Sequence, residues 1–206
     1  MNIRLEHTGK RYRRYWVFRG VSDAFTQSDV VAVLGANGSG KSTMLRVLSG
    51  LLTPSEGRVI WENQGRTVMP GEVYSQVAWC APALSLYENF TLQEAIRFHL
   101  HFRSLRSGIS VSKLPEIMEL ELHETKVLSE FSSGMKQRVK LALAILSDAP
   151  LLLLDEPTSH LDEHGVSWFH DLLGEHLAGR LTFIASNRVE SETAWCNRIL
   201  EITDFK

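Results

Sequence analysis

A glycine-rich stretch at residues 35–43, Gly-Ala-Asn-Gly-Ser-Gly-Lys-Ser-Thr, constrains the fold more than any other part of the chain. An apolar run, Val30 to Leu34, precedes it, and Met44 to Leu48 follows it with apolar residues at helical spacing. This order predicts a strand, a tight turn and a helix. Glycines let several backbone N–H groups point at one anion, and the helix N-terminus adds partial positive charge. We therefore expect a phosphate-binding loop.

The loop also carries two side chains with distinct chemistry. Lys41 is expected to reach the terminal phosphates of a nucleotide triphosphate, and the hydroxyl of Ser42 to bind Mg²⁺. The residues expected to hold the nucleotide are Gly35, Asn37, Gly38, Ser39, Gly40, Lys41, Ser42 and Thr43.

The composition is that of one ordinary globular domain. The chain has 206 residues, of which 44% are hydrophobic and 22% are charged. A formal net charge of −2 gives no reason to expect a nucleic-acid ligand. The longest apolar runs, Leu141 to Leu146 and Leu151 to Leu154, are too short to cross a bilayer. We expect any role at a membrane to depend on a partner.

Strands and helices are expected to alternate on both sides of a helical insert. Residues 1 to about 34 are rich in strand patterns, and residues from about 83 to 135 form the insert. Alternation favours a mostly parallel sheet with helices on its faces. Outside the first 34 residues we expect strands at 58–61, 76–80, 151–154, 181–185 and 198–202, and helices at 91–106, 111–122, 133–147 and 163–177.

The second part of the expected site is acidic and follows the apolar run Leu151 to Leu154. Asp155 and Glu156 come directly after these four leucines. Ligands of open α/β sheets lie at the carboxyl ends of the strands, so we expect Asp155 to hold Mg²⁺ beside the phosphate loop. Glu156 stands where a general base for water would be needed.

Two further motifs carry a resemblance to a known family. Residues 131–138, Phe-Ser-Ser-Gly-Met-Lys-Gln-Arg, resemble the signature motif of ATP-binding-cassette (ABC) ATPases, and residues 159–162 resemble the D-loop of that family. With the phosphate loop, these motifs occur in the family's order and span nearly the whole chain. The resemblance implies an α/β P-loop NTPase fold: an ABC ATPase core with a mostly parallel sheet, an N-terminal antiparallel β subdomain and a small helical insert. We expect residues 1–206 to form one such ATP-binding domain.

The resemblance also implies an activity and partners. It implies that ATP and Mg²⁺ bind, that Glu156 and Lys41 take part in hydrolysis, and that Ser132 and Gly134 contact the nucleotide of an opposite subunit. The chain would then work as a homodimer, or as a heterodimer with another ABC ATPase. It would drive a separate transmembrane permease from the cytoplasmic face of the cell membrane. We expect the coupling surface on the insert near Leu84, Leu86, Tyr87 and Phe90, because this loop is richer in apolar groups than solvation alone would favour.

One aromatic residue is expected to stack on adenine. Tyr12 matches the family's position for this ring, ahead of the first strands. Tyr15 and Trp16 compete for the role, and packing in the core is an equal alternative for any of the three.

Two positions depart from the family pattern. Asn187 stands where the family places a histidine that senses the terminal phosphate, and Pro82 or a neighbour stands where a glutamine is usual. An amide donates a hydrogen bond but moves no proton. We expect Asn187 to contribute a polar contact, and we expect hydrolysis to be slow or to depend on a partner. In the signature, Ser133 replaces a glycine and Met135 replaces a glutamine, and these substitutions are milder than the two departures above.

Other functions remain open at this level. A degenerate cassette could bind ATP as a switch with little turnover. A non-transport member of the family would usually carry two cassettes or a long coiled-coil insertion, and this chain has neither. In its short length the chain resembles the haem-exporter subunits of cytochrome c biogenesis.

Overall fold

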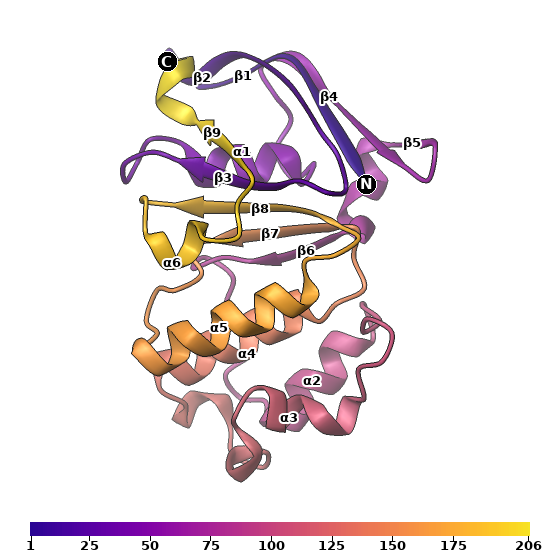
Figure 1. The fold of residues 1–206 in the computed structure, drawn as a ribbon, viewed down its shortest axis with the longest axis vertical. Helices are drawn as coiled ribbons and strands as arrows, with labels where there is room; N and C mark the ends of the chain where they lie inside the picture. Colours follow the sequence, from indigo (N-terminus) through magenta and orange to yellow (C-terminus); the bar gives the residue numbers. More distant parts are fainter. The chain divides into compact units, whose positions relative to one another are not determined.

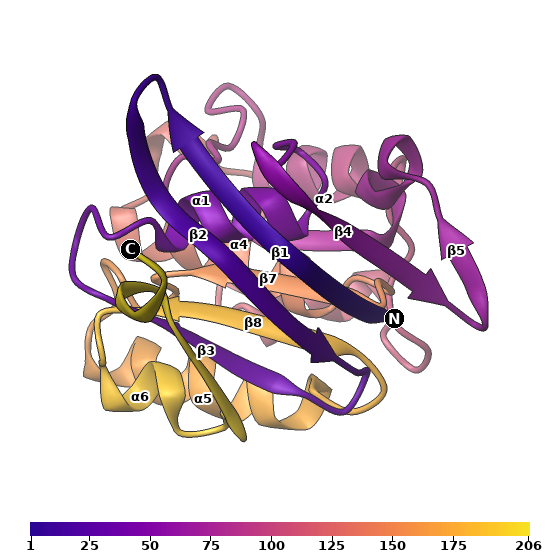
Figure 2. The same cartoon turned by 90° about the horizontal axis from the view of Figure 1, so that it is seen from above.

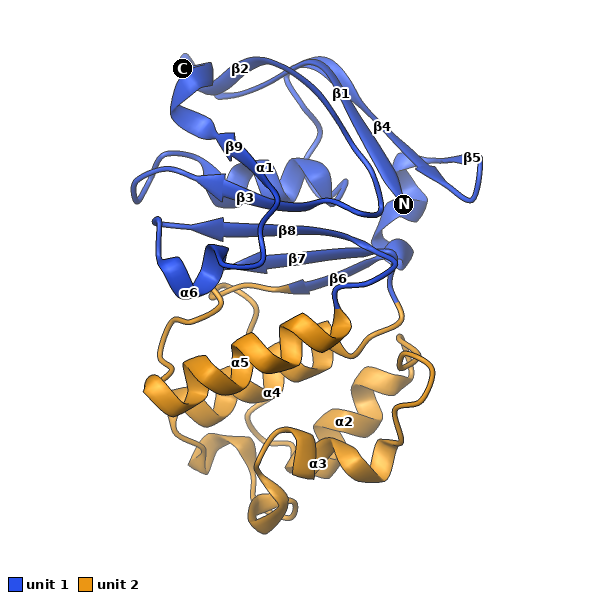
Figure 3. Cartoon of the chain, in the orientation of Figure 1, with its two compact units in different colours: residues 1–79, 149–156, 177–206 blue, residues 80–148, 157–176 orange.

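The computed structural model describes all 206 residues and divides them into two compact units (Figure 3). Unit 1 comprises residues 1–79, 149–156 and 177–206, and unit 2 comprises residues 80–148 and 157–176. Unit 2 therefore extends beyond the insert expected at 83–135. The assignment of residues 1–206 to one domain stays a prediction.

Unit 1 begins with an antiparallel sheet in the order β2-β1-β4-β5 (Figure 2). Ile3 and Leu5 of the first strand are buried and alternate with exposed residues, as a strand with one buried face requires. The short last strand was not predicted, because three residues give no measurable alternation. The strands are β1 (Asn2–Tyr12), β2 (Tyr15–Phe25), β4 (Glu56–Asn63) and β5 (Arg66–Val68).

The second sheet of unit 1 has the order β6-β7-β8-β3-β9 (Figure 1). The pairs β3–β8, β3–β9 and β7–β8 are parallel. Every residue of β3, β7 and β8 is buried, as in a sheet covered on both faces. The strands are β3 (Val30–Leu34), β6 (Val77–Cys80), β7 (Leu151–Asp155), β8 (Leu181–Ser186) and β9 (Arg198–Glu201).

Helix α1 (Lys41–Leu48) packs in one core with both sheets of unit 1. Its apolar side chains belong to one hydrophobic core together with residues of both sheets. The indole N–H of Trp61, on β4, donates to the carbonyl oxygen of Leu48 at 2.8 Å. The helix that begins at the phosphate loop is therefore fixed by packing and by a buried hydrogen bond.

Unit 1 also contains short elements that the sequence did not predict. They are the 3₁₀ helix η1 (Pro70–Gln76), helix α6 (Glu190–Thr193) and the 3₁₀ helix η5 (Ile202–Phe205). Elements of four to seven residues are too short for a periodic apolar face to stand out.

Unit 2 is helical, and α4 lies beside α5 (Figure 3). A capping box begins α2: the N–H of Thr91 donates to Glu94 Oε2 at 2.8 Å, and the N–H of Glu94 donates to Thr91 Oγ1 at 3.2 Å. The elements are α2 (Leu92–Leu100), η2 (Val111–Lys113), α3 (Leu114–Ile117), η3 (Glu121–His123), η4 (Leu128–Glu130), α4 (Ser133–Ile145) and α5 (Glu163–His176). No helix has the length and apolar character needed to span a membrane.

The helix predicted at 91–106 is wrong at its C-terminal end. Helix α2 stops at Leu100, and the following residues pair with the segment after α4 instead. The N–H of Arg106 donates to the carbonyl of Leu146 at 2.9 Å, and the N–H of Asp148 donates to Ser104 at 2.8 Å. Long-range backbone bonds thus replace the last turn that the sequence pattern suggested.

The single helix predicted at 111–122 is also wrong. The segment forms η2, α3 and η3, three short turns of helix. Glu119 has a φ of 56°, which lies in the left-handed region and interrupts any right-handed helix. The apolar spacing reflects the burial of Leu114, Met118 and Leu120, whereas Leu122 is 87% exposed.

Candidate functional site

The phosphate loop and the acidic residues of unit 1 lie at one edge of the parallel sheet. The loop follows β3, Asp155 and Glu156 lie at the end of β7, and Asn187 follows β8. These three strands are neighbours in the order β7-β8-β3. Parallel neighbours have their carboxyl ends at the same edge, so the chain order brings these side chains together.

The phosphate loop has a shape that only glycine permits. Gly35, Gly38 and Gly40 have φ values of 151°, 75° and 116°. A Cβ on Gly40 would overlap Val17 of β2, and a Cβ on Gly35 would overlap the hydroxyl of Ser39. Val17 of β2 therefore packs closely against the loop, a contact that the sequence pattern did not indicate.

The start of α1 suits an anion. Gly40 occupies the N-cap, no side chain caps the helix, and the first turn has no acidic residue. The Ser39 hydroxyl oxygen is buried without a hydrogen-bond partner. Uncapped N–H groups and an unpartnered hydroxyl are the donors that a phosphate group would take up. Asn37 and Gly38 lie exposed in the same loop, and Thr43 is half-buried within α1.

Lys41 is 4% exposed and is held by oxygen atoms. Its ammonium group donates to the carbonyl of Gly35 at 2.9 Å, to Ala36 at 3.3 Å and to Asn187 Oδ1 at 2.6 Å. It also lies 3.8 Å from Glu156 Oε1. The contact with Asn187 was not predicted, because nothing in the sequence pairs residues so far apart.

Asp155 is buried and lies beside the half-buried side chain of Ser42. The Asp155 side chain is 5% exposed and is hydrogen-bonded to Ser42. Burial, aided by the charge of Glu156, raises the pKa of Asp155, while the bond from Ser42 and the charge of Lys41 oppose the rise. A buried carboxylate beside a hydroxyl is a hard donor set that a Mg²⁺ ion would stabilise.

The protein groups of this site do not surround a cation completely. No group of three or more His, Cys, Asp or Glu side chains is arranged to hold a metal ion. Mg²⁺ is usually bound through one or two carboxylates together with substrate phosphates and water. The pair Ser42 and Asp155 therefore fits a metal that arrives with a nucleotide.

Glu156 is held in an uncommon backbone conformation. Its φ is 49°, in the left-handed region, and its N–H donates to the carbonyl of Ala185 on β8 at 3.0 Å. Its side chain is 34% exposed, and Oε1 accepts a hydrogen bond from Asn187 Nδ2 at 3.0 Å. The carboxylate is thus directed at the residues that follow β8 and β3.

The three aromatic candidates for adenine stacking lie around the β1–β2 turn. Tyr12 and Tyr15 are paired across the hairpin and are 46% and 82% exposed. Trp16 is half-buried, and the guanidinium groups of Arg11 and Arg19 lie over its ring at 5.6 Å and 4.7 Å. Core packing is thus excluded for both tyrosines, and the role of Tyr12 stays a prediction.

The signature residues lie in unit 2, at the start of α4. Ser132 is the N-cap, and its hydroxyl accepts a hydrogen bond from the N–H of Met135 at 3.2 Å. A Cβ on Gly134 would come within 3.1 Å of the carbonyl oxygen of His160. Glycine therefore lets the backbone of His160 pack closely on the first turn of α4.

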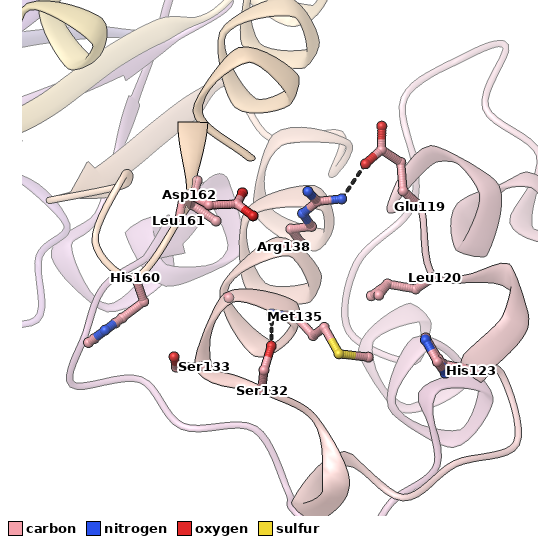
Figure 4. Close-up of a pocket in the computed structure, with 11 residues that line it drawn as sticks. Glu119, Leu120, His123, Ser132, Ser133, Met135, Arg138, His160, Leu161 and Asp162 are labelled. Atoms are coloured by element: carbon pink, nitrogen blue, oxygen red, sulfur yellow. Dashed lines mark hydrogen bonds and ion pairs between the residues drawn. The ribbon is translucent and has the colours of Figure 1, made fainter. Parts of the chain in front are cut away.

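A pocket of about 400 Å³ opens beside this turn (Figure 4). Figure 4 shows Ser132 and Met135 between the 160–162 loop on one side and the segment around Leu120 on the other. The pocket is lined by Glu119, Leu120, His123, Ser132, Ser133, Gly134, Met135, Arg138, His160, Leu161 and Asp162.

An ion-pair network at this pocket was missed. Glu119 Oε2 accepts from Arg138 on α4 and from His164 Nε2, at the start of α5, at 2.8 Å. The indole N–H of Trp168 donates to the carbonyl of Ile117 at 2.7 Å, and the Arg138 guanidinium lies 5.5 Å from the Trp168 ring centre. Together these contacts tie α3, α4 and α5 to one another.

Unit 2 also exposes a row of aromatic rings, which we call the aromatic row. Tyr87, Phe90, Phe98 and Phe102 follow one another with ring centres 5.1 to 5.5 Å apart. Only the first two belong to the predicted coupling surface. Phe98 lies on α2 and Phe102 in the segment after it, where we expected a helix and no part of the coupling surface.

Comparisons with known proteins show what this chain is similar to. A family model described as ABC transporter matches residues 18–159. The uncharacterized ABC transporter ATP-binding protein YybJ of Bacillus subtilis (strain 168) is 30% identical over 200 residues, covering 94% of this chain and 88% of that protein. The cytochrome c biogenesis ATP-binding export protein CcmA of Cupriavidus pinatubonensis is 36% identical, covering 84% of this chain and 77% of that protein.

Solved structures share the fold. The structure of an ATP-binding subunit of an ABC transporter matches with a TM-score of 0.82 and 25% identity, covering 98% of this chain and 85% of that chain. The dimeric structure of a bacterial ABC transporter cassette matches with a TM-score of 0.81 and 23% identity, covering 97% of this chain and 93% of that chain. The predicted fold class is confirmed.

Proposed function

Because this chain belongs to the ABC transporter family, we propose that it is an ATPase subunit that drives a separate transmembrane permease. The resemblance seen in its motifs is thereby confirmed. The relatives include a protein named for export and another named for bacitracin transport. The proposal accordingly concerns the ATP-dependent step that such subunits share.

One observation carries the proposal. Lys41, Asp155, Glu156 and Asn187 converge at the carboxyl edge of the parallel sheet in unit 1. An anion-binding helix start, a buried carboxylate hydrogen-bonded to a hydroxyl, and a second carboxylate are the three parts that phosphoryl transfer to water needs.

Each side chain then has a role in hydrolysis. The amides of the loop and Lys41 would hold the phosphates, and Ser42 with Asp155 would hold Mg²⁺. Mg²⁺, when bound, neutralises phosphate charge. Glu156 would orient the attacking water and accept its proton, since its carboxylate is partly exposed and lies beside the lysine.

A second copy would complete the site. Ser132 and Gly134 begin a helix of 13 residues, and a pocket opens beside that start. The N-terminus of a helix attracts phosphate, so this surface suits the terminal phosphate of a nucleotide held by another subunit. ATP would thus draw two subunits together, and hydrolysis would release them.

Slow or partner-dependent turnover is part of the proposal. Asn187 cannot relay a proton, and Pro82, exposed in the turn after β6, has no side-chain donor. These two residues also favour the second candidate, a cassette that binds ATP as a switch with little turnover.

Hydrolysis can be measured with the purified full chain. We expect phosphate release from ATP at less than about 10 per second, an ordinary rate for efficient enzymes. Chelation of Mg²⁺ should abolish the release, because the phosphate charge is then no longer neutralised by a metal held at Ser42 and Asp155. Release that continues unchanged after chelation would contradict the proposed site.

The aromatic row supports a permease partner and a peripheral position at the cytoplasmic face of the membrane. Tyr87 and Phe102 are 61% and 67% exposed. Neighbouring rings of this size at a surface are typical of a protein-binding site. We propose that the permease covers this row.

Charge introduced into the row should uncouple the subunit. We expect Tyr87→Glu to reduce co-purification with the permease at least tenfold, because a carboxylate would be desolvated at the contact. ATP binding should be unchanged. Tyr74→Glu, at a tyrosine 71% exposed in unit 1, is the matched control. Equal recovery of the permease with both variants would exclude the row as the contact.

A further inference from the structure

The amide of Asn187 links the two charged groups of the proposed site. Its oxygen accepts from Lys41 at 2.6 Å, and its nitrogen donates to Glu156 at 3.0 Å. An amide can do both at once, because it has an acceptor and two donors. The contact with Lys41 is the shortest that this ammonium group makes.

Lys41 has no free donor in this arrangement. An ammonium group has three N–H bonds, and the partners are the oxygens of Gly35, Ala36 and Asn187. The side chain is 4% exposed, so water has little access to it. A phosphate oxygen that binds to Lys41 must therefore displace one of these partners.

Asn187 is the partner that can yield. The oxygens of Gly35 and Ala36 belong to the backbone of the phosphate loop, which Val17 and Ser39 pack closely. Asn187 is exposed, and a rotation of its side chain moves the oxygen away. Binding of a phosphate therefore costs the charge-assisted hydrogen bond between Lys41 and Asn187.

The other half of the amide acts on Glu156. Glu156 Oε1 lies 3.8 Å from Lys41 and accepts from Asn187 Nδ2. Without that donor, the carboxylate is free to close on the ammonium group. The Glu156 carboxylate would then no longer be in place to orient the attacking water.

We propose that Asn187 is a positioning residue with opposite effects on the two steps: it competes with phosphate for Lys41 and so weakens ATP binding, and it holds Glu156 in place and so supports turnover. This inference rests on the proposed function. It differs from a direct polar contact with the terminal phosphate, because such a contact would strengthen ATP binding.

The binding test uses Asn187→Ala in a Glu156→Gln chain, which stops hydrolysis and removes the competing carboxylate. We expect the Kd for MgATP to fall roughly tenfold on this change, since a charge-assisted hydrogen bond no longer has to be broken. Asn187→Asp should raise the Kd, because a carboxylate binds Lys41 more strongly. A Kd that rises with alanine would overturn the competition.

The turnover test is a double-mutant cycle. Asn187→Ala alone should slow phosphate release at saturating ATP about tenfold or more, and in the Glu156→Gln chain it should cause no further loss, because the residue acts through Glu156. Equal losses in both backgrounds would contradict the positioning role. Asn2→Ala, at an exposed asparagine of β1, is the control.

Failure of the proposed function would look different. If the Glu156→Gln chain bound no MgATP, the nucleotide site itself would be refuted. If it bound MgATP with the same affinity with and without Asn187, the site would stand and the inference about Asn187 would fail.

Discussion

Glu156→Gln is expected to lower ATP turnover by about 10³-fold, because a general base contributes about 10²- to 10⁴-fold. The replacement keeps the shape of the side chain and its capacity to accept from Asn187, so MgATP binding should be preserved. Phosphate release at saturating ATP and the Kd for MgATP are the two measurements.

The same variant separates an enzyme from a switch. If hydrolysis ends the association of two copies, gel filtration with MgATP should show a stable dimer for the variant and a return to monomer for the unmodified chain. If both chains stay dimeric and release phosphate equally slowly, ATP acts as a switch ligand and Glu156 is not a base.

Gly40→Ala is expected to weaken MgATP binding by at least about 100-fold. The residue has a φ of 116°, and its Cβ would overlap Val17 of β2. A non-glycine residue in such a conformation costs about 1–3 kcal/mol before any overlap is counted. Relief of that strain would shift the start of α1 and the amides that lie there.

A second substitution identifies the cause. Val17→Ala shortens the side chain that Gly40→Ala would meet, and the double variant should recover part of the lost affinity. Gly71→Ala, at a glycine with open space around it, should change nothing. Equal affinity in the Gly40→Ala chain and the unmodified chain would show that β2 does not shape the loop.

The sequence predicted most of unit 1 because its signals are local. The run Leu151 to Leu154 is wholly apolar, and the glycine pattern at 35–43 specifies a turn by backbone freedom alone. Both therefore indicate a structure without knowledge of partners. The grouping of polar side chains at the ends of these strands followed from chain order, since parallel neighbours share an edge.

Unit 2 was harder to predict because its shape depends on distant contacts. Nothing near Leu100 indicates that α2 ends there, since the cause is the pairing of residues 104–106 with residues 146–148. The left-handed Glu119 also lacks a signal, because glutamate is not a residue favoured at positive φ. For the same reason the network around Glu119 and Arg138 was invisible.

Asn187 illustrates the limit at the site itself. Its place after β8 was correct, and its expected partner was a phosphate. The structure adds two partners in the protein, Lys41 and Glu156, and these are set by the spacing of three strands. No pattern along the chain encodes which atoms of an amide face which charge.

The left-handed backbone conformation of Glu156 lowers the stability of the fold at a residue proposed to act in turnover. A φ of 49° is a conformation that glycine or asparagine adopts with less strain, so the chain retains about 1 kcal/mol of avoidable instability at this position. Selection for thermal stability alone would replace the glutamate, whereas the proposed role as general base would retain it. Engineering a more robust form of this protein should therefore leave residue 156 untouched and seek its gains elsewhere in the fold.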